Sequence, residues 1–122
     1  MPHFRIETNV PKGKIPADLP AKIAQTLSKV LAGKPLNYCA VTVVGDVNTS
    51  FGGDATKPAA QATLMSIGAL GPKENVKISK ALAEVVEQSI GVPSDRMYIH
   101  FQNAAASDVG YNGTTFGEIF GG

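Results

Sequence analysis

The sequence has one cysteine, no tryptophan and almost no net charge. A lone Cys39 excludes an internal disulfide framework and any Cys-x-x-Cys redox or zinc motif. No apolar run approaches the roughly 20 residues that a membrane-spanning helix needs. Eleven Lys and Arg against ten Asp and Glu give a formal charge of +1. We therefore expect no nucleic-acid partner and no membrane insertion, because the sequence has neither a basic field nor a long apolar segment.

The length and composition of the chain fit one globular domain. The chain has 122 residues, of which 43% are hydrophobic and 17% charged, so we expect residues 1–122 to form a single domain. The first ten residues, MPHFRIETNV, include Arg5 and Glu7 and lack the apolar stretch of a signal peptide. The default expectation is a cytoplasmic protein.

A strand, a helix and a second strand are predicted in the first half of the chain. In residues 3–8, Phe4 and Ile6 alternate with polar neighbours, which is typical of a half-buried strand. The β-branched run over 38–44 predicts a strand that is buried on both faces. Between them, one apolar stripe of an amphipathic helix consists of Leu19, Ile23, Leu27, Val30 and Leu31.

The same order of elements recurs in the second half. Residues 62–67 and 97–102 predict strands, the second of them buried. Gly91 and Pro93 end the intervening helix as Gly33 and Pro35 end the first. The apolar stripe of this helix consists of Ile78, Leu82, Val85, Val86 and Ile90.

This duplication predicts an α/β fold made of two β-α-β repeats. With right-handed crossovers, the repeats form a four-stranded sheet with two helices on one face. The other face would need cover, which a two-layer domain of this size usually finds by oligomerising. Near the end of the chain, Asn112-Gly113 predicts a short hairpin.

No common catalytic motif is visible, and no metal or cofactor site is expected. His3 and His100 are more readily explained as surface or pocket residues than as metal ligands. Cys39 is more readily a small apolar core residue than a nucleophile. Pro2 has two interpretations. It can simply begin a strand, or, once Met1 is removed, its secondary amine can act as a base at neutral pH if its pKa is lowered.

Six sequence fragments occur in order along the chain. They are MPxFxxxTNVP at the start, Gly33-Lys34-Pro35 before Tyr38, Phe51-Gly52-Gly53, Ser66-Ile67-Gly68, residues 93–99 (PSDRMYI) and residues 109–116 (VGYNGTTF). Together they resemble the macrophage migration inhibitory factor family, which includes D-dopachrome tautomerase and belongs to the tautomerase superfamily. The resemblance runs from Met1 to Phe116 and favours the second interpretation of Pro2.

The resemblance implies a homotrimer whose three sheets enclose a central barrel, with an active site at each subunit interface. It implies that Pro2, as the processed N-terminus, shuttles a proton in a keto–enol tautomerisation. Lys34 and the backbone N–H of Ile67, next to Ser66, would bind the carboxylate of a phenylpyruvate-like substrate. Without the resemblance, Lys34 would be a cation at a helix C-terminus and Ile67 an ordinary core residue.

The resemblance also implies the rest of the substrate pocket. Tyr98 and His100 would reach its far end from the neighbouring subunit, with His100 where many members carry Asn. The apolar wall would consist of Val109, Tyr111 and Phe116. His3 replaces a residue that is often apolar and borders this pocket.

Three departures from the family pattern bear on function. Ala59 and Ala62 stand where some members carry Cys-x-x-Cys, so thiol–oxidoreductase activity is not expected. Lys12 and Asp46 occupy the places of a basic and an acidic residue that are linked to cytokine action. Residues 117–122 (GEIFGG) extend past the shorter members and would pack on the adjacent subunit or cover part of the pocket mouth.

Three functional hypotheses follow from the residues and the resemblance. The first is a tautomerase of phenylpyruvate-type and dopachrome-type substrates. The second is a non-catalytic ligand that is secreted without a signal peptide and acts on a cell-surface receptor. The third, a tautomerase scaffold with neither role, is disfavoured by the presence of Pro2, Lys34 and Tyr98.

Overall fold

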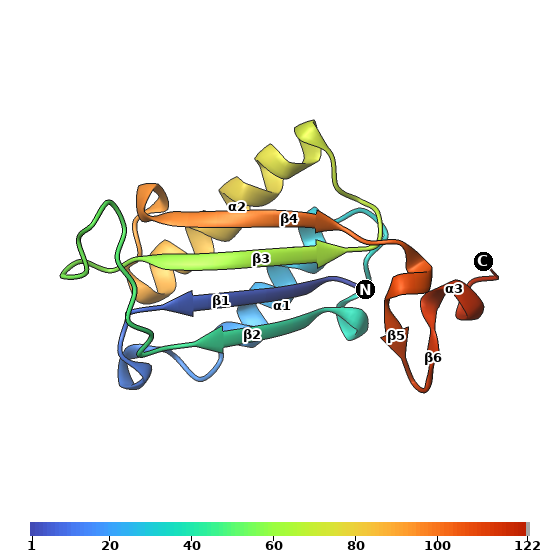
Figure 1. The fold of residues 1–122 in the computed structure, drawn as a ribbon, viewed down its shortest axis with the longest axis horizontal. Coiled ribbons are helices and arrows are strands. Elements are labelled where there is room, and N and C mark those ends of the chain that lie inside the picture. Colours follow the sequence, from blue (N-terminus) through green and yellow to red (C-terminus); the bar gives the residue numbers. More distant parts are fainter. Residues whose placement is uncertain (122) are drawn as a thin grey trace.

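Two β-α-β units form the body of the protein in a computed structural model that describes residues 1–121 (Figure 1). The first unit consists of β1 (His3–Thr8), α1 (Leu19–Val30) and β2 (Ala40–Val44). The second consists of β3 (Ala60–Ser66), α2 (Pro72–Ile90) and β4 (Met97–Asn103). Short 3₁₀ helices are η1 (Lys12–Lys14), η2 (Leu36–Tyr38), η3 (Ser94–Arg96) and η4 (Ala106–Asp108).

The four long strands form one mixed sheet in the order β2-β1-β3-β4. Each β-α-β unit contributes a parallel pair, and the two units meet where β1 runs antiparallel to β3. Both long helices cross behind the sheet, on the same face (Figure 1). The predicted duplicated α/β fold is therefore confirmed.

The core lies between this helical layer and the sheet. Leu19, Ile23 and Leu27 of α1 are fully buried, as the predicted apolar stripe requires. Pro72 occupies the first turn of α2, and Gly91 ends the helix in the left-handed region with φ 75°. From the sheet, the alternate residues Phe4, Ile6 and Leu64 complete the core and are also fully buried.

The burial predicted for two strands is wrong. β2 begins at Ala40 instead of 38, and its residues are exposed or half-buried. In β4, the exposed Tyr98 and His100 alternate with the half-buried Ile99 and Phe101. Both long helices lie on one face of the sheet, so no strand is covered by helices on both faces (Figure 1). β2 and β4 are also the edge strands. The β-branched run did not reveal this, because β propensity does not distinguish an edge strand from a central one.

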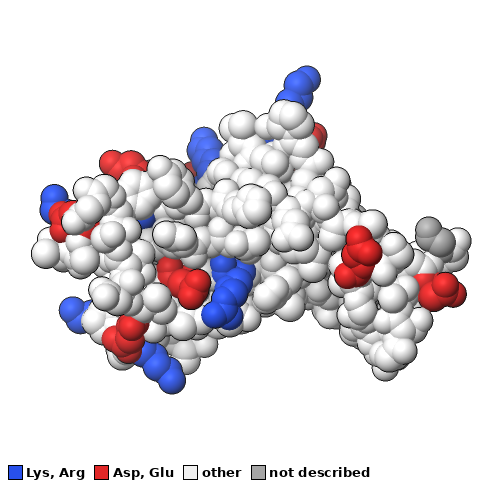
Figure 2. Space-filling view, in the orientation of Figure 1, with Lys and Arg blue, Asp and Glu red and all other residues white. Residues whose placement is uncertain are grey.

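The open face of the sheet is polar. Next to Tyr98 it carries Arg5 and Glu7, whose side chains lie 3.9 Å apart, together with Gln61 and Thr63. Figure 2 shows this face largely uncharged, with no broad field of one sign. The uncovered second face is present as predicted, and its polar side chains can be solvated in a single chain. Its cover by oligomerisation stays a prediction.

A small arm projects from one end of the sheet (Figure 1). It consists of β5 (Gly110–Tyr111), β6 (Thr114–Thr115) and α3 (Phe116–Ile119). Asn112 and Gly113 connect the two strands with φ of 54° and 80°, the positive pair that a tight hairpin turn requires. The predicted hairpin is confirmed, and the N-terminus lies at the same end of the sheet as the arm (Figure 1).

The residues predicted as a C-terminal extension continue the arm. The Glu118 N–H donates to Thr115 Oγ1 at 3.3 Å and so caps α3. The Phe120 ring stacks on Phe116 with centroids 5.6 Å apart. Gly117 packs against the backbone of Ser107, where a Cβ atom would lie only 3.2 Å away. Gly122, the last residue of the extension, lies outside the described residues.

Candidate active site

A pocket of about 260 Å³ opens where the N-terminus meets the arm. It combines the start of the chain, the segment before β2, the end of β3 and the arm, four parts that are distant in sequence. Its lining residues are Met1, Pro2, His3, Asn37, Tyr38, Cys39, Ala40, Met65, Val109, Tyr111 and Phe116.

The N-terminus is held in this pocket by the sheet itself. The Ala40 N–H donates to the Pro2 carbonyl at 3.0 Å, which extends the parallel pairing of β1 with β2. Pro2 is buried, and Met1 and His3 on either side of it are half-buried. Proline within a chain has no N–H to donate to a neighbouring strand. The start of a strand is a position where this missing donor is tolerated.

Aromatic rings form one wall of the pocket. The Tyr38 ring meets Tyr111 and Phe116 edge-on, with centroids 5.5 Å and 5.8 Å apart. Tyr111 and Phe116 are stacked at 5.2 Å. Such contacts stabilise beyond simple burial. The short hairpin therefore helps to form the pocket wall, because it brings Tyr111 and Phe116 against Tyr38 of η2.

A cation lies beside the terminal amine. Burial, and next the charge of Lys34, lower the pKa of the Met1 amine below 8.0. Burial also lowers the pKa of Lys34 itself. The Lys34 ammonium donates a hydrogen bond to the Ile67 carbonyl. An amine at this end of the sheet is thus more easily deprotonated than a free terminus.

Ser66 and Ile67 lie at the end of β3, where Lys34 contacts Ile67, and none of these three residues lines the pocket. The Ser66 hydroxyl is buried and donates to the Gly68 carbonyl at 2.8 Å, so it fixes the turn. Ile67 follows the strand, which ends one residue earlier than the predicted 62–67 segment. Ile67 is half-buried, and its carbonyl accepts from Lys34.

Cys39 packs against the core, as its sequence context favoured, but it is only partly buried there. It precedes β2, is half-buried and lines the pocket. Burial raises the pKa of its thiol above 9.0. A thiol with a raised pKa is protonated at neutral pH, so Cys39 is a poor nucleophile there.

Tyr98 and His100 do not join Pro2 within one chain. They line a separate hollow on the open face, beside Arg5 and Glu7. Tyr98 is in register with Gln61, which pairs with Glu7, whereas Pro2 precedes the other end of β1. From strand spacing and rise, the Cα atoms of His3 and Tyr98 are roughly 16 Å apart. β4 begins at the end of the sheet opposite the N-terminus (Figure 1).

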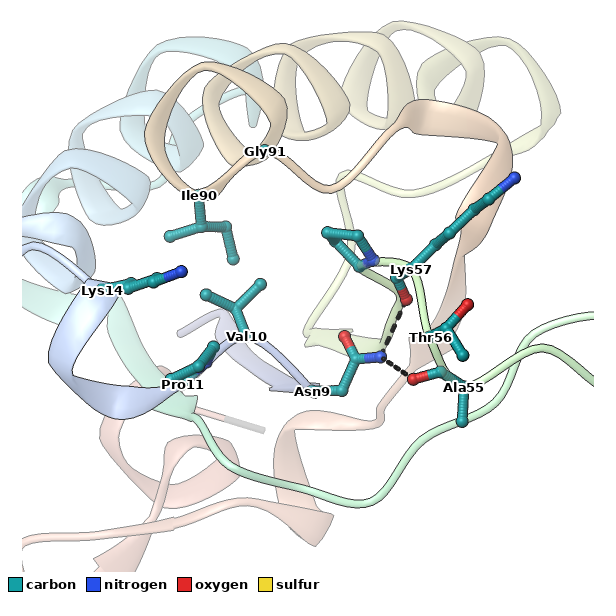
Figure 3. A pocket seen from close by; sticks show the side chains of 10 residues that line it. Asn9, Val10, Pro11, Lys14, Ala55, Thr56, Lys57, Ile90 and Gly91 are labelled. Carbon is teal, nitrogen blue, oxygen red and sulfur yellow. Dashed lines mark hydrogen bonds between the residues drawn. The ribbon is translucent and has the colours of Figure 1, made fainter.

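A further pocket of about 330 Å³ lies beside Asn9 and holds none of the predicted site residues (Figure 3). The Asn9 amide donates to the carbonyls of Lys57 at 2.9 Å and Ala55 at 3.5 Å. In Figure 3 the Lys57 side chain points away from the hollow, while Lys14 extends beside Ile90. Because no set of polar groups converges here, we assign this pocket a structural role.

Two features are absent from the described residues 1–121. No described group of three or more His, Cys, Asp or Glu side chains is placed to hold a metal ion. None of the described helices is both long and apolar enough to cross a membrane.

Besides Met1, sequence reasoning missed five lining residues, which are Asn37, Tyr38, Cys39, Ala40 and Met65. Tyr38 was visible in a family fragment but was read as the start of a strand, whereas it ends the 3₁₀ helix η2. Its contacts with Tyr111 and Phe116 depend on how the arm folds back. No pattern of local hydrophobicity contains that information.

The fold is that of a tautomerase-type protein. The macrophage migration inhibitory factor structure from Trichinella spiralis matches with a TM-score of 0.88 and 41% identity, covering 93% of this chain and 99% of that one. The homologue structure from Prochlorococcus marinus matches with a TM-score of 0.86 and 32% identity, covering 94% and 99%.

Sequence comparison identifies the family. The model of the macrophage migration inhibitory factor family matches residues 1–117. The homolog from Trichinella spiralis is 43% identical over 116 residues, which are 95% of this chain and 100% of the relative. The Xenopus laevis factor is 38% identical over 116 residues, with 95% and 99% covered. The chain belongs to the macrophage migration inhibitory factor family, and membership supports a tautomerase-type isomerase with a cytokine-like role.

Proposed function

We propose that this protein is a keto–enol tautomerase of phenylpyruvate-type and dopachrome-type substrates, with the Pro2 amine as general base. The observation that carries the proposal is the lowered pKa of the terminal amine in an aromatic-walled pocket. The lowered pKa is that of the Met1 amine, and the adjacent Pro2 is itself buried. In this proposal, removal of Met1 places the proline amine in the same surroundings. A base whose pKa is close to the working pH transfers protons most effectively.

The proposed reaction moves one proton and leaves atoms and charge balanced. The neutral Pro2 amine takes a proton from the carbon next to the substrate ketone, and the electron pair forms the enol double bond. The prolinium then returns the proton to the enolate oxygen. Lys34 binds the substrate carboxylate, and its charge disfavours a protonated Pro2 in the resting enzyme.

The site is completed, in this proposal, by a second copy of the chain in a homotrimer. Pro2, Val109, Tyr111 and Phe116 lie together at one end of the sheet, while Tyr98 and His100 face solvent elsewhere. One chain therefore supplies a base and an apolar wall but no far end for the pocket. A neighbouring subunit that presents Tyr98 and His100 would supply that end.

The base is tested by replacing Pro2 with Gly, which keeps an N-terminal amine but removes the ring. We expect phenylpyruvate turnover to fall about 10²- to 10⁴-fold, the usual contribution of general acid–base catalysis. Sedimentation must first show that the variant assembles as the wild type does. Wild-type turnover in a correctly assembled variant would show that the proline is not the base.

We also propose a ligand role at a cell-surface receptor, because Lys12 and Asp46 adjoin in the structure. The Lys12 N–H donates to the Asp46 carboxylate at 3.1 Å, and both side chains are exposed. The double charge reversal Lys12→Glu and Asp46→Lys should weaken binding of labelled protein to macrophages and leave turnover unchanged. Unchanged cell binding would remove this surface from the proposal.

A further inference from the structure

One guanidinium organises the loop between β2 and β3. Arg96, in η3 just before β4, donates through Nε to the Pro58 carbonyl at 2.9 Å and through Nη1 to the Phe51 carbonyl at 3.2 Å. Its Nη2 donates to the carbonyls of Asp54 at 2.9 Å and Lys57 at 3.1 Å. Four carbonyls from one loop thus converge on a single side chain.

Only arginine fits this role. A guanidinium has five N–H donors fixed in a plane, whereas a lysine ammonium has three donors around one point. The described ion pairs are Arg5–Glu7 and Lys22–Asp18, so Arg96 binds backbone carbonyls and no carboxylate among residues 1–121. The carbonyls of Phe51, Asp54 and Lys57 each accept a second hydrogen bond from within the chain. The loss of Arg96 would therefore remove one of two bonds at these three carbonyls and the one described bond at the Pro58 carbonyl.

The same guanidinium fixes an aromatic ring. The Arg96 guanidinium carbon lies 5.8 Å from the centre of the Phe51 ring, within cation–π range. Phe51 and Asp54 exchange two backbone hydrogen bonds of 3.1 Å across Gly52 and Gly53, which have φ of 60° and 80°. Such positive angles suit glycine, so this tight turn depends on both residues.

Phe51 in turn contacts a predicted substrate-binding residue. The rings of Phe51 and Tyr98 have centroids 4.9 Å apart and are tilted by 48°. Tyr98 is 69% exposed, so little else within the chain restricts where its ring lies. The contact joins the loop of residues 51–58, whose carbonyls Arg96 binds, to Tyr98, which would form the far end of the pocket.

We propose that Arg96 and Phe51 are positioning residues for Tyr98. Arg96 holds the loop, the loop presents Phe51, and Phe51 sets the pose of the Tyr98 ring against the substrate of a neighbouring subunit. This inference rests on the proposed function, because Tyr98 reaches substrate only if the pocket is shared between subunits. Ordering a ring before substrate arrives strengthens binding by reducing the entropy lost on association.

The test is a double-mutant cycle with phenylpyruvate as substrate. Arg96→Lys and Phe51→Leu are each made in the wild type and in a Tyr98→Ala background, and KM and kcat are measured separately. Contacting residues usually couple, so we expect KM to rise about 3- to 10-fold in the wild type and less than about 2-fold in the Tyr98→Ala background. We expect kcat to change less than KM in all four comparisons.

Phe101→Leu is the matched control, because it also truncates a phenylalanine but lies on the core side of the sheet. It should lower the melting temperature and leave KM at the wild-type value. A readout without substrate accompanies the kinetics. In Arg96→Lys, amide hydrogen exchange over residues 51–58 should be faster, and the Tyr98 ring signals should shift.

The outcomes separate this inference from the function on which it rests. A wild type without turnover would refute the proposed function and this inference with it. If the wild type is active but KM rises equally in both backgrounds, Arg96 does not act through Tyr98 and the inference alone fails. If Arg96→Lys assembles poorly, Phe51→Leu decides by the same criterion.

Discussion

The two ends of the sheet differ in how much of a site each one builds. At the N-terminal end, Pro2 and Phe116 are buried and the pKa of the terminal amine is lowered. At the opposite end, Tyr98 is 69% exposed beside a loop that Arg96 holds by its carbonyls. The difference teaches that one chain encloses its terminal amine and an apolar wall at one end of the sheet but only displays Tyr98 at the other. Shared sites between subunits would bring the two ends together.

After the loss of turnover expected for Pro2→Gly, the largest expected effect concerns the cation at the N-terminal end. Lys34→Ala removes a charged hydrogen-bond partner, so we expect kcat/KM for phenylpyruvate to fall about 10- to 100-fold. Because the Lys34 charge lowers the pKa of the nearby amine, its loss should also move the acid limb of the pH–rate profile to higher pH. The methyl ester of the substrate is the control, since it lacks the carboxylate and should lose less. Equal losses for acid and ester would contradict the assignment of Lys34.

A complementation assay tests whether the two ends meet between subunits. Pro2→Gly and Tyr98→Ala proteins are each purified, then unfolded and refolded together at equal concentration. In a closed ring of randomly mixed subunits, about a quarter of the sites would combine an intact Pro2 with an intact Tyr98. Activity should therefore rise above the mean of the two parents. Activity equal to that mean would indicate that each site lies within one subunit.

The arm offers a comparison of buried and exposed rings. Phe116 is 4% exposed and Phe120 is 59% exposed, although the two rings stack on each other. We expect Phe116→Ala to lower the free energy of unfolding by about 3 kcal/mol and Phe120→Ala by less than about 1 kcal/mol. Urea denaturation measures both. Similar losses would mean that the extension after Phe116 contributes to stability as much as the wall itself.

The smallest expected effect is the loss of thermal stability at low pH that Asp54, in the loop of residues 51–58, contributes. Hydrogen bonds from the Thr56 hydroxyl and N–H lower the pKa of Asp54 below 3.8. A carboxyl whose pKa is lower in the folded state than in the unfolded state stabilises the fold at pH values above its unfolded pKa. This stabilisation is lost as the pH falls through the folded pKa. Melting temperatures between about pH 6 and about pH 3 should fall slightly less for Asp54→Asn than for the wild type. Identical curves would show that these hydrogen bonds contribute nothing to folding.

Much of the fold was predictable because each element carries its own pattern. The stripe from Leu19 to Leu27, the turn at Asn112-Gly113 and the stop at Gly91 are local signals, and the structure follows each of them. Burial was less predictable. The β-branched run of β2 gives no indication that the strand lies at an edge, because strand order depends on pairing between distant segments.

Only part of the candidate site was predictable, because the rest depends on contacts between segments that are distant in sequence. Pro2 stood out by its position and Lys34 through the resemblance. Pro2 lines the pocket, whereas Lys34 is not among the lining residues. Tyr38 and the Arg96–Phe51 contact were not found, since both depend on how loops fold back on the sheet. Tyr98 shares a strand face with His100, but no spacing places it relative to a neighbouring subunit.

The most direct test of the Pro2 base combines intact mass and turnover on one sample. Mass spectrometry of the purified protein shows whether Met1 is removed, and a phenylpyruvate tautomerase assay follows at once. The account predicts loss of Met1 together with turnover. Loss of Met1 without turnover would contradict it, and so would turnover with Met1 retained, because Pro2 would then be an amide without a free amine.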